Sequence, residues 1–151
     1  MPLFVVACET APHRDYAPTT ARFFLESANG EGGRVTLPQS GVRIAVAPKP
    51  VFTEFDVVNV EIAEVELGKC LMFQLTPAAA RDLYRLTGAN QGRRLVLTLN
   101  GVARGARRID RPFDGGTILV FVETPDEKLP ALVENLRKTA ADLQRELAKK
   151  S

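Results

Sequence analysis

The sequence contains no tryptophan, a single histidine and only two cysteines. Two cysteines are too few for the disulfide framework that stabilises many small secreted domains. The lone histidine, His13, leaves no credible serine–histidine pair for nucleophilic catalysis and no cluster of side chains that would ligate a metal. We therefore expect no cofactor and no bound metal, and we expect that the protein is not an enzyme.

Long apolar runs and a charge excess are missing as well. No stretch approaches the roughly 18 apolar residues that cross a bilayer, and the formal net charge is only +2. The 151 residues are 45% apolar and 25% charged, which is typical of one globular domain with short appendages. Aromatic residues are not interleaved with the basic ones, so the sequence does not favour nucleic acid as a partner.

The chain begins with a short apolar run that ends at a cysteine. Residues 3–6 are apolar, Ala7 is small and Cys8 follows. A bacterial lipoprotein signal needs a small residue for cleavage and the cysteine sulfur for the lipid, so we predict that Cys8 is lipidated. A complete signal has a basic start and a longer apolar run. Either the start codon lies further upstream, or this segment is an exposed tail with a stray cysteine.

The lipoprotein interpretation predicts a periplasmic protein tethered to a membrane. Residues 1–20 would be a truncated signal and a polar tether. Glu9 and Thr10 lack the aspartate that resembles an inner-membrane retention signal, which weakly favours the outer membrane. The second cysteine, Cys70, lies in a strand-like run and is expected to be a small buried thiol. A disulfide between Cys8 and Cys70 is the less favoured alternative.

Alternating apolar residues predict an N-terminal β arm over residues 21–50. The main domain is expected to follow over residues 51–151. Within the main domain, the apolar alternation changes parity after Ile62, which predicts a β-bulge near Ala63. Gly68-Lys69 is expected to form the turn that follows. Residues 117–122 are apolar on both faces, so we expect a central strand that is covered on both sides or shielded by the arm.

Two helices and one hairpin have clear local signals. Thr76-Pro77 supplies a hydroxyl cap and a proline for a first helix that Gly88 ends. Asn100-Gly101 predicts a tight hairpin. A second helix is expected from about residue 126 to 150, with Pro130 in its first turn. The order of elements predicts an α+β fold, a mostly antiparallel sheet with two helices packed on one face.

An acidic run over residues 54–66 contains no basic residue. Glu64 and Glu66 share one expected strand face, where two close carboxylates could do acid–base chemistry. A solvated strand face, or pairing with arginines, is the favoured alternative because exposed carboxylates are seldom catalytic. Ser40 lies in a loop and is expected to be a turn residue.

Six arginines form the clearest surface feature. They lie within nineteen residues and face a single aspartate, Asp110. The six are Arg93, Arg94, Arg104, Arg107, Arg108 and Arg111. They could contact anionic lipid headgroups or an acidic protein partner, and we take them as the predicted partner-binding surface. The alternative, which the residue pattern favours, is a charged edge strand that resists aggregation and faces the acidic run over residues 54–66.

Several short motifs follow one another in the second half of the chain. They are Leu75-Thr76-Pro77 with three alanines after it, Thr87 followed by Gly92-Arg93-Arg94-Leu95, the hairpin at residues 99–102, and Gly115-Gly116 followed by Thr124. In this combination, residues 71 to about 136 resemble the head subdomain of the first periplasmic domain of SecD, a membrane protein of bacterial protein export. The resemblance covers about half of the chain and implies an α+β fold in an extracytoplasmic setting.

The resemblance does not carry over the whole activity of SecD. SecD has transmembrane helices whose charged residues couple proton flow to export, and no such helix is predicted here. Likeness of fold alone does not establish function. We therefore expect a non-enzymatic envelope lipoprotein whose SecD-head-like domain binds another protein, such as a component of the export translocon or of envelope assembly. The alternative is a periplasmic domain that encloses a small ligand between the arm and the head.

Overall fold

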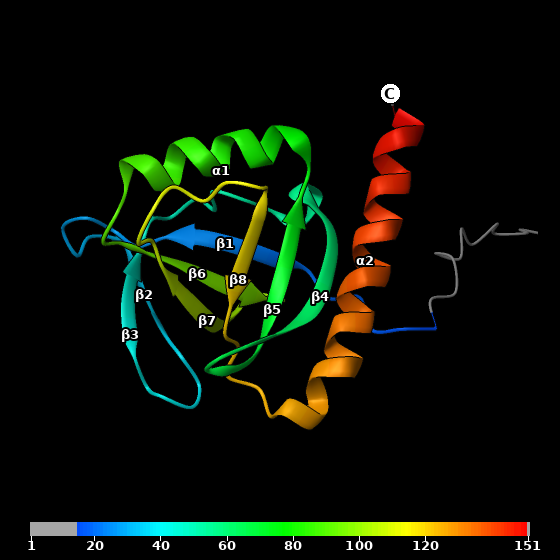
Figure 1. The fold of residues 1–151 in the computed structure, drawn as a ribbon, viewed down its shortest axis with the longest axis horizontal. Coiled ribbons are helices and arrows are strands. Elements are labelled where there is room, and N and C mark those ends of the chain that lie inside the picture. The colour runs from blue at the N-terminus through cyan, green and yellow to red at the C-terminus, as the bar shows by residue number, and fades with distance from the viewer. Residues whose placement is uncertain (1–14, 151) are drawn as a thin grey trace, which may run out of the picture.

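The structure, a computed structural model, describes residues 15–150. Its elements are β1 (Ala21–Leu25), β2 (Gly33–Thr36), β3 (Arg43–Val46), β4 (Val57–Val65), β5 (Gly68–Leu75), α1 (Pro77–Ala89), β6 (Arg94–Leu99), β7 (Val102–Arg108), β8 (Thr117–Val120) and α2 (Leu129–Lys150). Single helical turns at Glu54–Asp56 and Asp126–Lys128 precede β4 and α2. Every strand pair is antiparallel, which confirms the predicted α+β class (Figure 1).

The strands form two three-stranded sheets, β1-β6-β7 and β4-β5-β8, and a separate two-stranded sheet, β2-β3. One main core lies between the two larger sheets and both helices bury residues in it. Phe23 of β1 and Phe73 of β5 meet there edge to face, with ring centroids 5.2 Å apart. A bridge between Gly105 and Val122 joins the edge of β7 to the chain just after β8.

The segment predicted as an arm divides into two parts. Its first strand, β1, pairs with β6 along its whole length, and Phe23 in that strand is fully buried. Its second part, the β2-β3 hairpin, packs Ile44 and Val46 against Val96 on the other face of β6. The β1-β6-β7 sheet, which we call the main sheet, is therefore covered by the core on one face and partly by this hairpin on the other.

The bulge predicted near Ala63 is wrong. The pairing of β4 with β5 runs without interruption from Asn59 to Val65, and the register shift lies between Val57 and Asn59. Val57 and Val60 both reach the core, so one extra residue is needed between them. Val65 is exposed near the tip of the β4–β5 hairpin, so the strand face on which it lies does not indicate which face of β4 meets the core.

Two further local predictions need correction. The β4–β5 turn consists of residues 66–67, because Val65 pairs directly with Gly68. The strand expected over residues 117–122 is β8, which is shorter and is fully covered on one face only. Ile118 and Val120 are buried, whereas Thr117 and Leu119 on the other face are half-buried.

The first helix begins as predicted and ends one residue later. The Thr76 hydroxyl accepts a hydrogen bond from the Ala79 N–H at 3.3 Å, and Pro77 occupies the first helical position. The helix continues past Gly88 to Ala89 because Asn90 closes it: the Asn90 side-chain amide donates to the Leu86 carbonyl at 2.7 Å. The hairpin prediction is also confirmed, since Asn100 and Gly101 both have positive φ.

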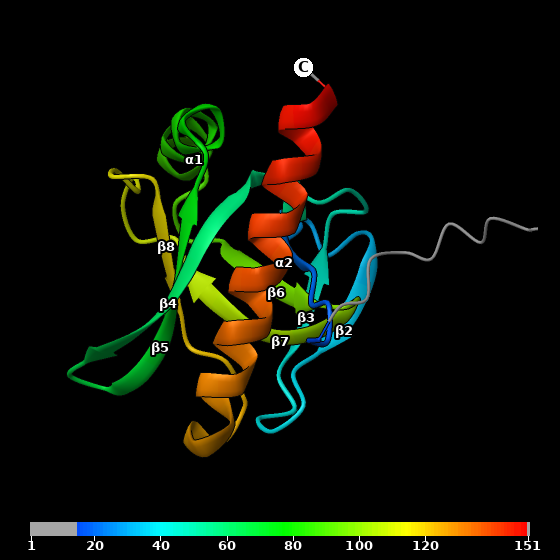
Figure 2. The same cartoon turned by 90° about the vertical axis from the view of Figure 1, so that its right-hand side faces the viewer.

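The second helix covers one edge of the fold (Figure 2). Pro130 lies in its first turn, where a missing N–H costs no helical hydrogen bond. Arg137 Nε donates to the Val60 carbonyl at 2.8 Å, and Gln144 Nε2 donates to the Val57 carbonyl at 3.3 Å. These bonds satisfy β4 carbonyls that would otherwise be open to another strand. No helix among residues 15–150 is long and apolar enough to cross a membrane.

The last six residues of the predicted polar tether, residues 15–20, contact the folded domain. The Tyr16 hydroxyl hydrogen-bonds the carboxylate of Asp142 in α2. The buried Thr19 N–H donates to the Thr139 hydroxyl at 2.9 Å. Residues 15–20 therefore lie against α2 and lead directly into β1.

Candidate binding surfaces

The predicted lipidation site Cys8 and the histidine His13 lie outside the described residues. Cys70 is buried, as predicted, and forms no disulfide with any residue from 15 to 150. Burial raises the pKa of the Cys70 thiol, against the opposing charge of Arg107, so this thiol stays protonated and unreactive.

The other candidate catalytic groups do not form an acid–base pair within the described residues. Ser40 is a turn residue, as expected, because its hydroxyl accepts the Val42 N–H at 3.3 Å. Glu64 and Glu66 are exposed, and Glu66 lies in the turn instead of on the strand face that was predicted for it. No cluster of three metal-ligating side chains occurs within residues 15–150.

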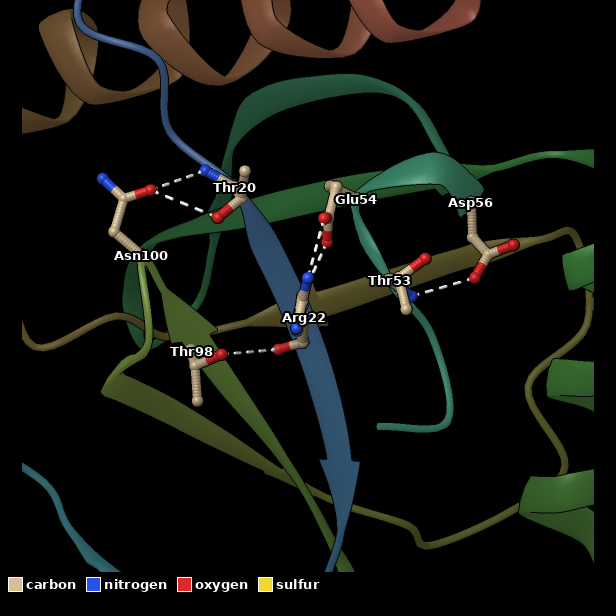
Figure 3. A network of polar contacts seen from close by, with 7 residues as sticks. All are labelled: Thr20, Arg22, Thr53, Glu54, Asp56, Thr98 and Asn100. Atoms are coloured by element: carbon tan, nitrogen blue, oxygen red, sulfur yellow. Dashed lines mark hydrogen bonds and ion pairs between the residues drawn. The ribbon is translucent and has the colours of Figure 1, made fainter. Parts of the chain in front are cut away.

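The acidic run does not face the arginines of the β6–β7 hairpin, contrary to one alternative from the sequence. Its partners come from β1 and α2. Glu54 forms a two-pronged ion pair with Arg22, with distances of 2.7 and 2.9 Å (Figure 3). Glu61 lies 3.6 Å from Arg137. The hydrogen bonds from Arg22, more than its charge, hold the pKa of Glu54 below its usual value, while partial burial opposes this.

The hairpin separates the six predicted arginines instead of presenting them together. Arg94 and Arg108 are opposite each other on the strand face that carries Val96, away from the main core. Arg94 binds Glu26 through two hydrogen bonds of 2.7 and 3.1 Å. These bonds lower the pKa of Glu26, with a smaller contribution from Arg108.

Arg107 points to the opposite face of β7 and is held in place by several groups. Its guanidinium carbon lies 4.9 Å from the centre of the Phe113 ring, one nitrogen donates to the Leu119 carbonyl at 3.3 Å, and another lies 3.6 Å from Asp110. Arg107 and Arg111 line a hollow of about 160 Å³. Arg93, Arg104, Arg108 and Arg111 make no side-chain hydrogen bond or ion pair with any residue of the described part.

An apolar groove lies between β1 and the β2-β3 hairpin, and none of its residues was singled out from the sequence as a ligand-binding residue. Every second residue from Thr20 to Phe24 lies on its floor, together with Val96 and Thr98 of β6. The complete lining of this β1–β2 groove, which has a volume of about 400 Å³, is Thr20, Arg22, Phe24, Gly33, Val35, Val46, Ala47, Pro48, Val96, Thr98 and Gly101. The alternation in β1 is visible in the sequence, but the pairing of β1 with β6 is not.

The polar groups of the groove are already engaged within the protein (Figure 3). The Asn100 side-chain oxygen accepts from the Thr20 N–H at 2.9 Å. The Thr98 hydroxyl lies 3.5 Å from the Arg22 carbonyl, and Glu54 neutralises the Arg22 guanidinium. The groove therefore offers apolar surface with a few polar atoms at one end and no unpaired charge.

The chain matches no protein-family model and no curated protein. It is similar to solved structures of SecDF. One is SecDF in a super-membrane-facing form, with a TM-score of 0.62 and 18% identity over 79% of this chain and 18% of that one. Another is a structure of SecDF described as a membrane component that enhances protein export, with a TM-score of 0.61 and 17% identity over 80% of this chain and 62% of that one. A third is SecDF from Thermus thermophilus, described as translocon-associated, with a TM-score of 0.55 and 17% identity over 82% of this chain and 20% of that one.

These comparisons show a SecD-like fold. The likeness extends over about four fifths of the chain, more than the stretch of residues 71 to about 136 on which the sequence resemblance rests. The chain spans about a fifth of the two longer SecDF chains and 62% of the shorter one. At this level of identity, the likeness concerns the fold alone.

Proposed function

We propose that this protein is a non-enzymatic lipoprotein of the cell envelope whose SecD-like domain binds a protein component of export or envelope assembly. The observation that carries the proposal is the likeness of fold to SecDF over about four fifths of the chain. Lipid on Cys8 would tether the domain on the periplasmic side of a membrane, with the outer membrane favoured.

The unpaired arginines of β7 are the proposed point of contact. Arg104 and Arg108 lie in one strand and neither makes an internal ion pair within the described residues. Forming a contact with an acidic partner would therefore break no ion pair of these two side chains. Arg94 is less suited to that role because Glu26 already satisfies its guanidinium.

The proposal is tested by chemical crosslinking of the full-length protein in its native host, with mass spectrometry of the captured proteins. We expect translocon or envelope-assembly subunits among the crosslinked proteins. Joint replacement of Arg104 and Arg108 by glutamate should reduce their capture by more than about fivefold, since like charges oppose association. The matched control replaces Arg34 and Arg43, two exposed arginines of the β2-β3 hairpin, and should leave capture unchanged.

A different result would count against the proposal. Capture of no envelope protein, together with recovery of the protein in the soluble fraction, would contradict both the partner and the tether. Equal loss of capture in the two double variants would mean that the contact does not depend on β7.

A second candidate function is supported by the β1–β2 groove. Its volume of about 400 Å³ falls in the range of small-molecule sites, and apolar side chains dominate its lining. The groove lies between the β2-β3 hairpin and the main sheet, as a ligand-binding domain of the predicted kind requires. Because Arg22 is neutralised by Glu54, the expected ligand is neutral and apolar.

This candidate is tested with the apolar dye N-phenyl-1-naphthylamine, whose fluorescence rises in apolar sites. We expect saturable binding of the dye that is lost in Val35→Trp, because the indole ring of the new side chain would occupy the groove. Val102→Trp, at a position that is 51% exposed and outside the groove, should bind the dye as the unchanged protein does. Equal binding by both variants would contradict the candidate.

A further inference from the structure

A second surface combines basic side chains, an exposed ring and two hollows. The loop of residues 109–116 connects β7 to β8 and lies along α1, where Figure 1 shows it in yellow. The Phe113 N–H donates to the Thr87 hydroxyl at 2.8 Å. At the other end of the loop, a Cβ added to Gly116 would lie 2.9 Å from the Ala80 Cβ. Helix and loop therefore form one continuous surface.

Asp114 lies between two hollows of this surface. One is the hollow of about 160 Å³ at Arg107 and Arg111, and the other, of about 400 Å³, lies over α1. We call this surface the α1–loop face. Its members are Arg81, Tyr84, Arg85, Arg107, Arg111 and Asp114.

The arginines of the α1–loop face are available to a partner. Arg81, Arg85 and Arg111 are exposed and make no side-chain hydrogen bond or ion pair with any residue from 15 to 150. Arg107 is held in position by its contacts with Phe113 and the Leu119 carbonyl. Four arginines and Asp114 line this face. Asp110 lies 3.6 Å from Arg107, and the exposed Asp82 directly follows Arg81 in α1, so with these two neighbours the arginines outnumber the carboxylates by one.

We propose that the α1–loop face binds an acidic segment of another protein. Carboxylates of that segment contact the arginines on both sides of Asp114, and a hydrogen-bond donor between them contacts Asp114 itself. Tyr84, which is 54% exposed, supplies a rigid ring beside the larger hollow. Tyrosine and arginine are the residues that most often carry the binding energy of protein interfaces. The inference rests on the proposed function in taking a protein as the partner.

Asp114 favours a protein segment over a membrane surface. A lipid surface presents phosphates across the whole face, and the exposed Asp114 carboxylate would be repelled by them. An acidic segment places its charges at separate points and can offer an amide or ammonium group to Asp114. The two hollows also suit individual side chains better than a flat array of headgroups.

The test is a titration of the full chain with two synthetic peptides, Glu-Glu-Lys-Glu-Glu and Glu-Glu-Glu-Glu-Glu. Binding is monitored by the NMR shifts of the backbone amides. The lysine-containing peptide should bind more tightly, and shifts should be confined to the exposed side of α1 and to residues 110–116. Affinity should fall more than about fivefold between about 50 and about 200 mM salt because exposed charges are screened. Asp114→Asn should remove the preference for the lysine-containing peptide.

Matched charge reversals locate the site. Arg85→Glu with Arg111→Glu should weaken peptide binding more than about tenfold. Arg34→Glu with Arg43→Glu changes the net charge equally on a different hairpin and should leave affinity unchanged. Equal weakening in both pairs, shifts located elsewhere, or no binding at millimolar peptide would each overturn the inference.

Vesicle sedimentation tests whether the α1–loop face binds a membrane surface instead of a protein segment. If vesicles with roughly 30% phosphatidylglycerol bind through Arg85 and Arg111 while neither peptide binds, the face contacts lipid and the inference is wrong. If peptides fail but crosslinking in the host still captures export subunits through β7, the inference fails and the proposed function stands.

Discussion

At the scale of single residues, buried polar groups are matched by partners from distant parts of the chain. The pair of Arg22 and Glu54 joins β1 to the turn before β4. The carboxylate side chain is 11% exposed and the guanidinium side chain 48%. Solvent reaches one partner, so the pair contributes modestly to stability.

We predict that Glu54→Gln lowers the free energy of unfolding at neutral pH by about 1 kcal/mol. The pKa of Glu54 is lowered in the folded state, so its contribution is present above the ordinary carboxyl pKa and is lost as pH falls below it. The difference between the two proteins in urea unfolding should therefore shrink between pH 5 and pH 3. Glu134→Gln, which removes an exposed pair with Lys138, should have a smaller effect, and a difference that persists at pH 3 would contradict the account.

Thr139 tests the attachment of residues 15–20 to α2. It accepts a hydrogen bond from the Thr19 N–H, and both residues are buried. Thr139→Val keeps the side-chain shape but leaves that N–H without an acceptor, so we expect a loss of about 1–3 kcal/mol in urea unfolding. Thr36→Val, at an exposed position, is the control. Equal stability of the two variants would mean that residues 15–20 contribute nothing to the fold.

At the scale of elements, the two larger sheets depend on a close approach between β7 and the end of β8. A Cβ added to Gly105 would lie 2.3 Å from the Phe121 carbonyl oxygen, which is backbone and has little freedom to move. The bridge between Gly105 and Val122 forms at the same place. Glycine is therefore required here by space and not by its φ angle.

We predict that Gly105→Ala destabilises the protein by about 1–3 kcal/mol, because the strands must separate to admit the methyl group. Gly33→Ala is the matched control in another strand, since an added Cβ there meets nothing within 4 Å. Thermal unfolding of both variants checks the prediction. Equal melting temperatures would show that the junction of the sheets is not tightly packed.

At the scale of the whole molecule, the sequence predicted the α+β class and the local turns and helix starts, but not which distant strands pair. Thr76 and Pro77 determine where α1 begins, and Asn100-Gly101 determines the hairpin, because those residues act within a few positions of themselves. The pairing of β1 with β6 joins residues at least 70 positions apart, and no sequence signal in a single chain specifies it.

The candidate sites were harder to predict for the same reason. The six arginines are close in sequence, but strand alternation places Arg107 and Arg108 on opposite faces of β7. The α1–loop face adds Arg81 and Arg85, which lie more than twenty positions before Arg111 in the chain. The β1–β2 groove requires three separate segments to be placed together.

We propose that this SecD-like domain acts in protein export by binding a protein partner. The most direct test of this proposal is pulse-chase labelling of a secreted protein in the native host with the gene deleted. The account predicts slower conversion of precursor to mature protein, restored by the unchanged gene and by Arg34→Glu with Arg43→Glu, but not by Arg104→Glu with Arg108→Glu. Normal conversion in the deletion strain would contradict the claim and leave the β1–β2 groove as the feature to pursue.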